Sequence, residues 1–189
     1  MTLSWNVLGV IVLAFLASAA SSVALLAFGL DSLIEIGASI LVLWELSGAG
    51  VVTGAGTGAL RQRRALQLIG IAFILMAGYV LLQSSAALVF GQRSSPSAAG
   101  IVWMVSTAVV MFTLAAGKWR TGRALANPVL ITEGRVTLID AFLALAVLLG
   151  LVLHSSIGWW WADPAAGYVI VYYAIREAVH IFRAEAAMP

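Results

Sequence analysis

Long apolar segments take up most of this 189-residue chain, and they limit what it can fold into more than any other feature. Hydrophobic residues make up 62% of the chain and charged residues 10%, which excludes an ordinary water-soluble domain. About 20 apolar residues suffice for a helix to cross a bilayer. We therefore predict an all-α membrane protein with six transmembrane helices in a single domain, 1–189, and no soluble domain. The predicted spans are 4–21, 22–46, 64–90, 98–117, 127–153 and 159–183.

Basic residues are distributed unequally between the two sets of connections. They follow the second, fourth and sixth spans, whereas the opposite connections contain only Arg93. The positive-inside rule then places both termini in the cytoplasm. Trp159, Trp160 and Trp161 fall at the outer boundary, where aromatic side chains anchor a helix. The net charge of +2 comes from these few groups, so we expect the lipid bilayer as a partner and no nucleic acid.

No motif for catalysis is present in the connections. The glycine-rich segment 47–60 is predicted to be a flexible cytoplasmic loop, and it lacks a Gly-Lys phosphate-binding pattern. The chain contains no Ser-His-Asp set and no HExxH sequence. We expect no enzyme and no resident cofactor. Since the chain has no cysteine, a metal ion would bind to oxygen or nitrogen.

Asp31 and Glu35 lie four residues apart within an otherwise apolar helix. This spacing places both carboxylates on one helix face. Acidic groups at this depth are costly, face the interior of a bundle and often mark an ion path. The alternative is a hydrogen-bonded or protonated pair that holds helices together. Small residues such as Gly29 and Gly37 are expected to let the fifth span approach these acids.

A third acid, Asp140, is predicted to lie at a similar depth in the membrane. At about 1.5 Å per residue, Asp31 lies roughly 14 Å from the outer end of its span and Asp140 roughly 10 Å from the outer face. Glu133 and Val136 precede Asp140 by seven and four residues, and we place all three on one stripe of the fifth span. We hypothesise that Asp31, Glu35 and Asp140 converge. Glu133 is either an auxiliary ligand nearer the cytoplasm or the partner of a basic group.

Three segments together resemble a known family of membrane proteins. SSVALLAFGLDSLIEIGAS resembles the second transmembrane helix of the cation diffusion facilitators, in which Asp or His is followed four residues later by Asp. ALANPVLITEGRVTLIDAFLALAVLLG and GWWWADPAAGYVIVYYAIREAVHIF resemble the fifth and sixth helices of that family. Six spans with both termini inside fit the same family.

The resemblance implies a metal site between the second and fifth helices. In that family, two side chains from each helix form a tetrahedral site that exchanges a divalent cation for protons by alternating access. Asp31, Glu35 and Asp140 match the first, second and fourth ligand positions. Val136 falls on the third, where the family has His or Asp and where valine cannot bind a metal. Either Glu133 or water supplies this ligand, or the site has lost affinity.

Other features of the resemblance bear on assembly and on the ion. The family usually continues into a cytoplasmic domain that aids dimerisation, so here we expect a homodimer or heterodimer through membrane helices. Carboxylates suit Mg²⁺, Mn²⁺ or Fe²⁺ better than soft ions, although Zn²⁺ also accepts them, and Cd²⁺ is not distinguished. A carboxylate must be deprotonated to bind a metal, so protons and metal compete for the same oxygens.

Two functions therefore fit the sequence. The first is a proton-coupled exporter of divalent metal ions. The second is a non-transporting membrane subunit that pairs with, or regulates, a complete transporter. Arginine outnumbers lysine and alanine is abundant, which is typical of a GC-rich bacterial gene, so we expect the bacterial plasma (inner) membrane.

Overall fold

A computed structural model describes residues 2–49, 55–95, 97–125 and 128–186. These residues form six α-helices and no strand, which confirms the all-α prediction. Some helical residues are described without their side chains, Glu133 among them. The helices are α1 (Thr2–Ala20), α2 (Val23–Ala49), α3 (Ala55–Val89), α4 (Ala98–Ala124), α5 (Pro128–Ile157) and α6 (Ala162–Ala186).

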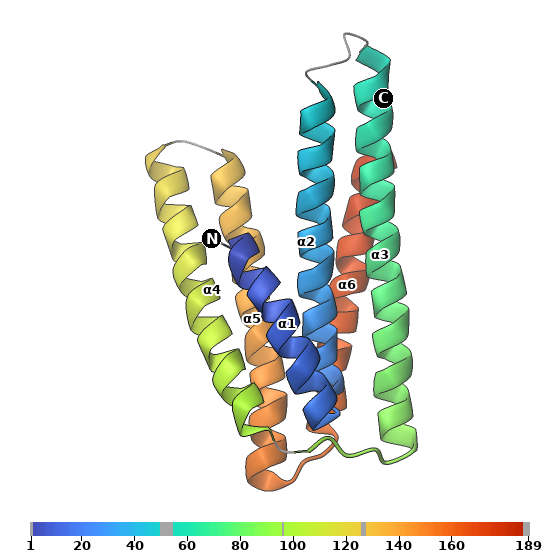
Figure 1. Cartoon of the computed structure of the whole chain (residues 1–189), viewed down its shortest axis with the longest axis vertical. Coiled ribbons are helices and arrows are strands. Elements are labelled where there is room, and N and C mark those ends of the chain that lie inside the picture. The colour runs from blue at the N-terminus through green and yellow to red at the C-terminus, as the bar shows by residue number, and fades with distance from the viewer. Residues whose placement is uncertain (1, 50–54, 96, 126–127, 187–189) are drawn as a thin grey trace.

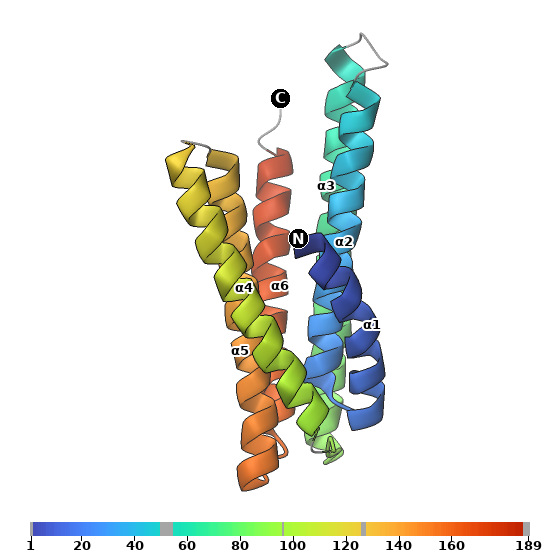
Figure 2. The same ribbon diagram turned by 60° about the vertical axis from the view of Figure 1, so that its left-hand side comes forward.

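The helices pack as pairs that run up and down the molecule (Figure 1). The closest pairs are α4 with α5, α3 with α6 and α1 with α2. Helix α2 also packs against α3 and α6, and it meets α5 over a shorter contact. Figure 2 shows the α4–α5 pair diverging from α2 and α3 toward the upper end of the molecule. The contact between α2 and α5 is therefore confined to part of their length.

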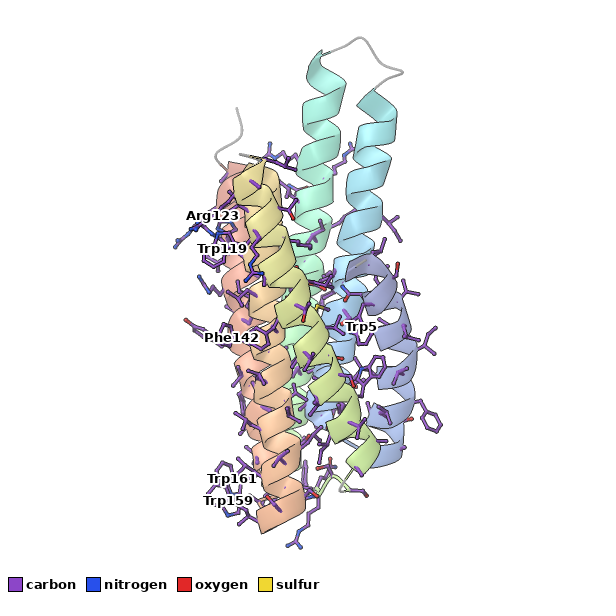
Figure 3. The ribbon with its side chains drawn as sticks, turned by 90° about the vertical axis from the view of Figure 1, so that its left-hand side faces the viewer. Trp5, Trp119, Arg123, Phe142, Trp159 and Trp161 are labelled. Atoms are coloured by element: carbon purple, nitrogen blue, oxygen red, sulfur yellow. The ribbon has the colours of Figure 1, made fainter. Side chains whose placement is uncertain are left out.

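Long apolar helices make this chain an integral membrane protein. Within the described residues, four stretches are long and apolar enough to cross a bilayer: Leu3–Ala20, Leu66–Val89, Ala98–Ala124 and Gly134–Ile157. Trp119 lies toward the upper end of α4, and Trp159 and Trp161 lie near the lower end of the bundle (Figure 3). Tryptophans at two levels are typical of the two interfaces of a membrane. Trp5 lies between these two levels.

Several helix ends differ from the sequence-based boundaries. Helix α3 already begins at Ala55, so residues 55–60 of the predicted loop 47–60 are helical, while 50–54 lie outside the described residues. Helix α4 continues to Ala124 through the basic residues after the apolar segment. Apolar content predicts where a helix is buried, but alanine, arginine and lysine sustain a helix beyond that point. Helix α6 begins at Ala162, so the tryptophan run precedes it.

Glycine in α2 allows a close helix contact, but with a different partner from the one expected. A Cβ atom added at Gly29 would lie 3.2 Å from the Cβ atom of Leu13 in α1. At Gly37 an added Cβ would meet nothing within 4 Å. The expectation that these glycines admit the fifth span is therefore wrong, since Gly29 brings α1 against α2.

The lower end of α2 is fixed by an acid from α6. Asp163 is 1% exposed, and its carboxylate accepts hydrogen bonds from the Ser22 hydroxyl and, at 3.0 Å, from the Val23 backbone N–H. Ser22 in turn accepts from the Leu25 N–H at 3.2 Å. Asp163 thus helps to cap α2, whose unpaired N–H groups favour an anion. His154 is 9% exposed and interacts electrostatically with Asp163.

Candidate metal site

Three carboxyl groups from two helices come together inside the bundle. Asp31 and Glu35 belong to α2 and Asp140 to α5, and one oxygen of each lies within 4.8 Å of the others. Asp31 and Asp140 are each 3% exposed, and Glu35 is half-buried. The structure confirms that these acids converge, and α2 and α5 contact each other.

The acids of this cluster are only partly satisfied by hydrogen bonds. Asp140 interacts electrostatically with Glu35, and Glu35 accepts a hydrogen bond from the Asn6 side-chain amide of α1 at 2.5 Å. Asp31 Oδ1 and Asp140 Oδ1 are buried and have no hydrogen-bond partner. Buried oxygens without donors are costly. The cluster therefore offers acceptor oxygens that a cation can satisfy.

The other two residues that the sequence placed on this stripe of α5 are not part of the cluster. Val136 is 39% exposed, whereas Thr137 is 2% exposed, so the buried face of α5 runs through Thr137 and Asp140. The expectation that Val136 shares the buried face of Asp140 is therefore wrong, because that face extends from Asp140 around the helix toward Thr137 and not toward Val136. The side chain of Glu133 lies outside the described residues.

A lysine lies beside the acid cluster. The Lys118 ammonium of α4 donates a hydrogen bond to Thr137 Oγ1 at 2.9 Å, and it interacts electrostatically with Asp140. Lys118 was predicted to lie in a cytoplasmic connection, but it belongs to α4 and is half-buried. Its positive charge partly balances the acids and opposes the entry of a second cation.

Helix α6 adds two further groups. Glu177 interacts unfavourably with Asp31, and Tyr173, which is 8% exposed, lies in the field of the same acids. Glu177 is half-buried, and its charge acts on the cluster.

Sequence reasoning missed three of these contributors: Asn6, Lys118 and Tyr173. A lone amide in the apolar segment LSWNVLGVIVLAF was a visible signal for Asn6, since buried polar groups need partners. Lys118 and Tyr173 had no comparable signal, because one follows an apolar segment and the other lies in an aromatic pair.

Comparison with known proteins agrees with this architecture. The chain matches the family model of the cation efflux transmembrane domain over residues 1–188. It is 28% identical to Transmembrane protein 163 of Xenopus laevis over 156 residues, which cover 79% of this chain and 53% of that protein. It is 23% identical to an uncharacterized transporter of Synechocystis sp. over 165 residues, which cover 86% of this chain and 53% of that protein. The chain thus spans about half the length of these curated relatives.

Proposed function

Because the chain belongs to the cation efflux family, we propose that it exports a divalent metal ion in exchange for protons and that Asp31, Glu35 and Asp140 bind the ion. One observation carries the proposal: three carboxyl oxygens from α2 and α5 lie within 4.8 Å of one another inside an apolar bundle. In a membrane such a cluster is costly unless it serves a cation or protons.

The spacing of the cluster supports one ion bound by all three acids. Metal–oxygen bonds of about 2.0–2.2 Å place three ligands of one ion at most about 3.8 Å from one another. From their 4.8 Å limit the oxygens of the cluster therefore need to move by roughly 1 Å. An all-oxygen set suits Mg²⁺, Mn²⁺ and Fe²⁺, and it accepts Zn²⁺. Glu133 serves as an auxiliary acid on the cytoplasmic approach.

Proton coupling is supported by the closeness of the acids, whose oxygens lie within 4.8 Å of one another. Like charges this close repel each other, which favours a proton on one of the carboxyl groups when no metal is bound. A metal ion that binds both must displace this proton, because a ligating carboxylate is deprotonated. Loading with metal and loading with protons therefore exclude each other, as antiport requires.

A second function rests on the position that the family resemblance assigns to the third ligand. That position is Val136, which is apolar and 39% exposed. A site with fewer ligands favours a membrane subunit that pairs with a complete transporter, as a homodimer or heterodimer through its helices. For either function we place the protein in a bacterial plasma membrane.

Transport by the purified protein distinguishes the two functions. We would reconstitute it in liposomes with an acidic interior and follow uptake of Mn²⁺, Fe²⁺, Zn²⁺, Cd²⁺ and Mg²⁺. Asp31→Asn and Asp140→Asn remove charge with little change in shape, and we expect each to lower uptake to the level of protein-free liposomes. Thr113→Val is the matched control, since Thr113 is exposed on α4 and donates to the Val109 carbonyl at 2.7 Å.

The control variant is expected to transport at the native rate. If the native protein transports none of the five ions, the exporter function is wrong. Transport that survives Asp31→Asn and Asp140→Asn would instead place the path elsewhere in the bundle.

A further inference from the structure

Asn6 of α1 is joined to the acid cluster by a hydrogen bond. It is 4% exposed, and its Nδ2 donates to Glu35 Oε2 at 2.5 Å. Its other polar atom, Oδ1, is equally buried and has no hydrogen-bond partner. A buried amide oxygen without a donor is costly. A cation bound next to the three acids would satisfy this oxygen.

Three residues that neighbour the acids or lie on the same helix are less suited to complete the site. Thr137 already accepts a hydrogen bond from Lys118. The Lys118 ammonium has no lone pair for a metal. Val136 has no ligand atom and is 39% exposed. Asn6 offers a neutral oxygen from a third helix.

We propose that Asn6 supplies the fourth ligand of the metal site through Oδ1, so that α1 joins α2 and α5 in binding the ion. This inference rests on the proposed function, and it adds a residue and an ion preference to that function. Three carboxylates and one amide oxygen make an all-oxygen site, which favours hard ions such as Mn²⁺ over ions that prefer imidazole or sulfur.

The geometry needs only a turn of the Asn6 amide. Half a turn about its Cβ–Cγ bond exchanges Oδ1 and Nδ2, and it places Oδ1 beside Glu35, where Nδ2 lies at 2.5 Å. Two oxygens bound to one ion at about 2.1 Å lie roughly 3.0–3.4 Å apart for angles between 90° and 109°. The two side chains thus need to separate by less than about 1 Å to share an ion.

Aromatic and polar side chains surround Asn6. Asn6 lines a narrow void together with Trp5, Trp103 and Thr107. Thr107 Oγ1 is buried without a partner, and a hydroxyl can both donate and accept. The rings of Trp5 and Trp103 stack with centroids 5.3 Å apart and hold α1 against α4. In the proposed site the amide donates to Glu35 when no metal is bound, and it turns its oxygen to the ion when metal arrives.

Binding of Mn²⁺ and Zn²⁺ to the purified full chain tests this assignment. Asn6→Leu keeps the size of the side chain but removes its oxygen, and we expect the Mn²⁺ Kd to rise at least about tenfold. Asn6→Asp retains an oxygen ligand, so Mn²⁺ binding should persist. Asn6→His introduces imidazole, and we expect the ratio of Zn²⁺ to Mn²⁺ affinity to increase at least about tenfold.

Val136→His is the matched control, because it introduces the same side chain on α5 at an exposed position. We expect it to leave the affinity ratio unchanged. Asp31→Asn reports on the acid cluster itself, and thermal unfolding identifies any variant that has not folded. The ion preference of Asn6→His separates a ligand from a residue that only positions Glu35.

Two results would overturn the assignment. The first is that Asn6→Leu binds Mn²⁺ like the native protein while Asp31→Asn loses binding. The acids would then bind the ion without Asn6, and Asn6 would be excluded as a ligand. A gain of Zn²⁺ preference by Val136→His and not by Asn6→His would place the fourth ligand on α5. Native protein that binds no ion refutes the proposed function itself and this assignment with it.

Discussion

The acid that caps α2 from α6 allows a test of the fold that is independent of transport. Asp163→Ala removes the acceptor of the Ser22 hydroxyl and of the Val23 backbone N–H. Both Asp163 and Ser22 are buried, at 1% and 2% exposure, so water cannot readily replace the lost carboxylate. The substitution should therefore loosen the start of the helix that carries Asp31.

The size of the effect follows from the bonds that are lost. A hydrogen bond to a charged group contributes about 1.5–3 kcal/mol, and loss of a helix cap costs about 0.5–2 kcal/mol. Ser22 retains its bond from the Leu25 N–H at 3.2 Å, which lowers the total. We expect Asp163→Ala to reduce the free energy of unfolding by about 2–4 kcal/mol. Asp163→Asn keeps one acceptor oxygen, so its cost should be about half as large.

Reversible unfolding in mixed detergent micelles measures this difference. Ser156→Ala is a suitable control, since Ser156 is exposed near the same end of the bundle and donates to the Val152 carbonyl at 2.6 Å. Its effect should stay within about 0.5 kcal/mol. An Asp163→Ala variant as stable as this control would refute the reasoning, because the cap would then contribute nothing to the fold.

Three further predictions concern the site and its packing. Lys118→Met should tighten Mn²⁺ binding by up to about tenfold, because it removes a positive charge that acts on Asp140; calorimetry showing weaker binding would contradict this. Mn²⁺ affinity should rise by about tenfold per pH unit for each proton released, and an affinity independent of pH would argue against competition with protons. Gly29→Ala should lower the free energy of unfolding by about 1 kcal/mol, because its Cβ would lie 3.2 Å from that of Leu13, and an unchanged stability in micelles would contradict this.

Apolar segments were enough to predict the number and order of the helices, because each span must satisfy its backbone hydrogen bonds internally in a membrane. They were not enough to locate the helix ends. Helices α3 and α4 extend past the apolar segments into 55–60 and 118–124, where alanine and basic residues still favour helix. Hydrophobicity stops being informative where the chain leaves the hydrocarbon.

The sequence likewise predicted part of the acid site and not the rest. The four-residue spacing of Asp31 and Glu35 and the depth of Asp140 come from the sequence alone, since helical rise fixes how far along a span each residue lies. Rise along one helix does not fix the rotation of that helix against its neighbours. That rotation places Val136 outward and Thr137 inward.

By itself, the sequence determined a six-helix membrane bundle with three acids at one depth. Only the tertiary structure brought Asn6 of α1 and Lys118 of α4 to those acids, and only it placed Asp163 at the start of α2. Periodicity and span length are properties of a single helix, so one segment of the sequence is enough to predict them. Contacts between helices depend on packing among side chains from distant segments, so they appear only when the whole bundle is assembled.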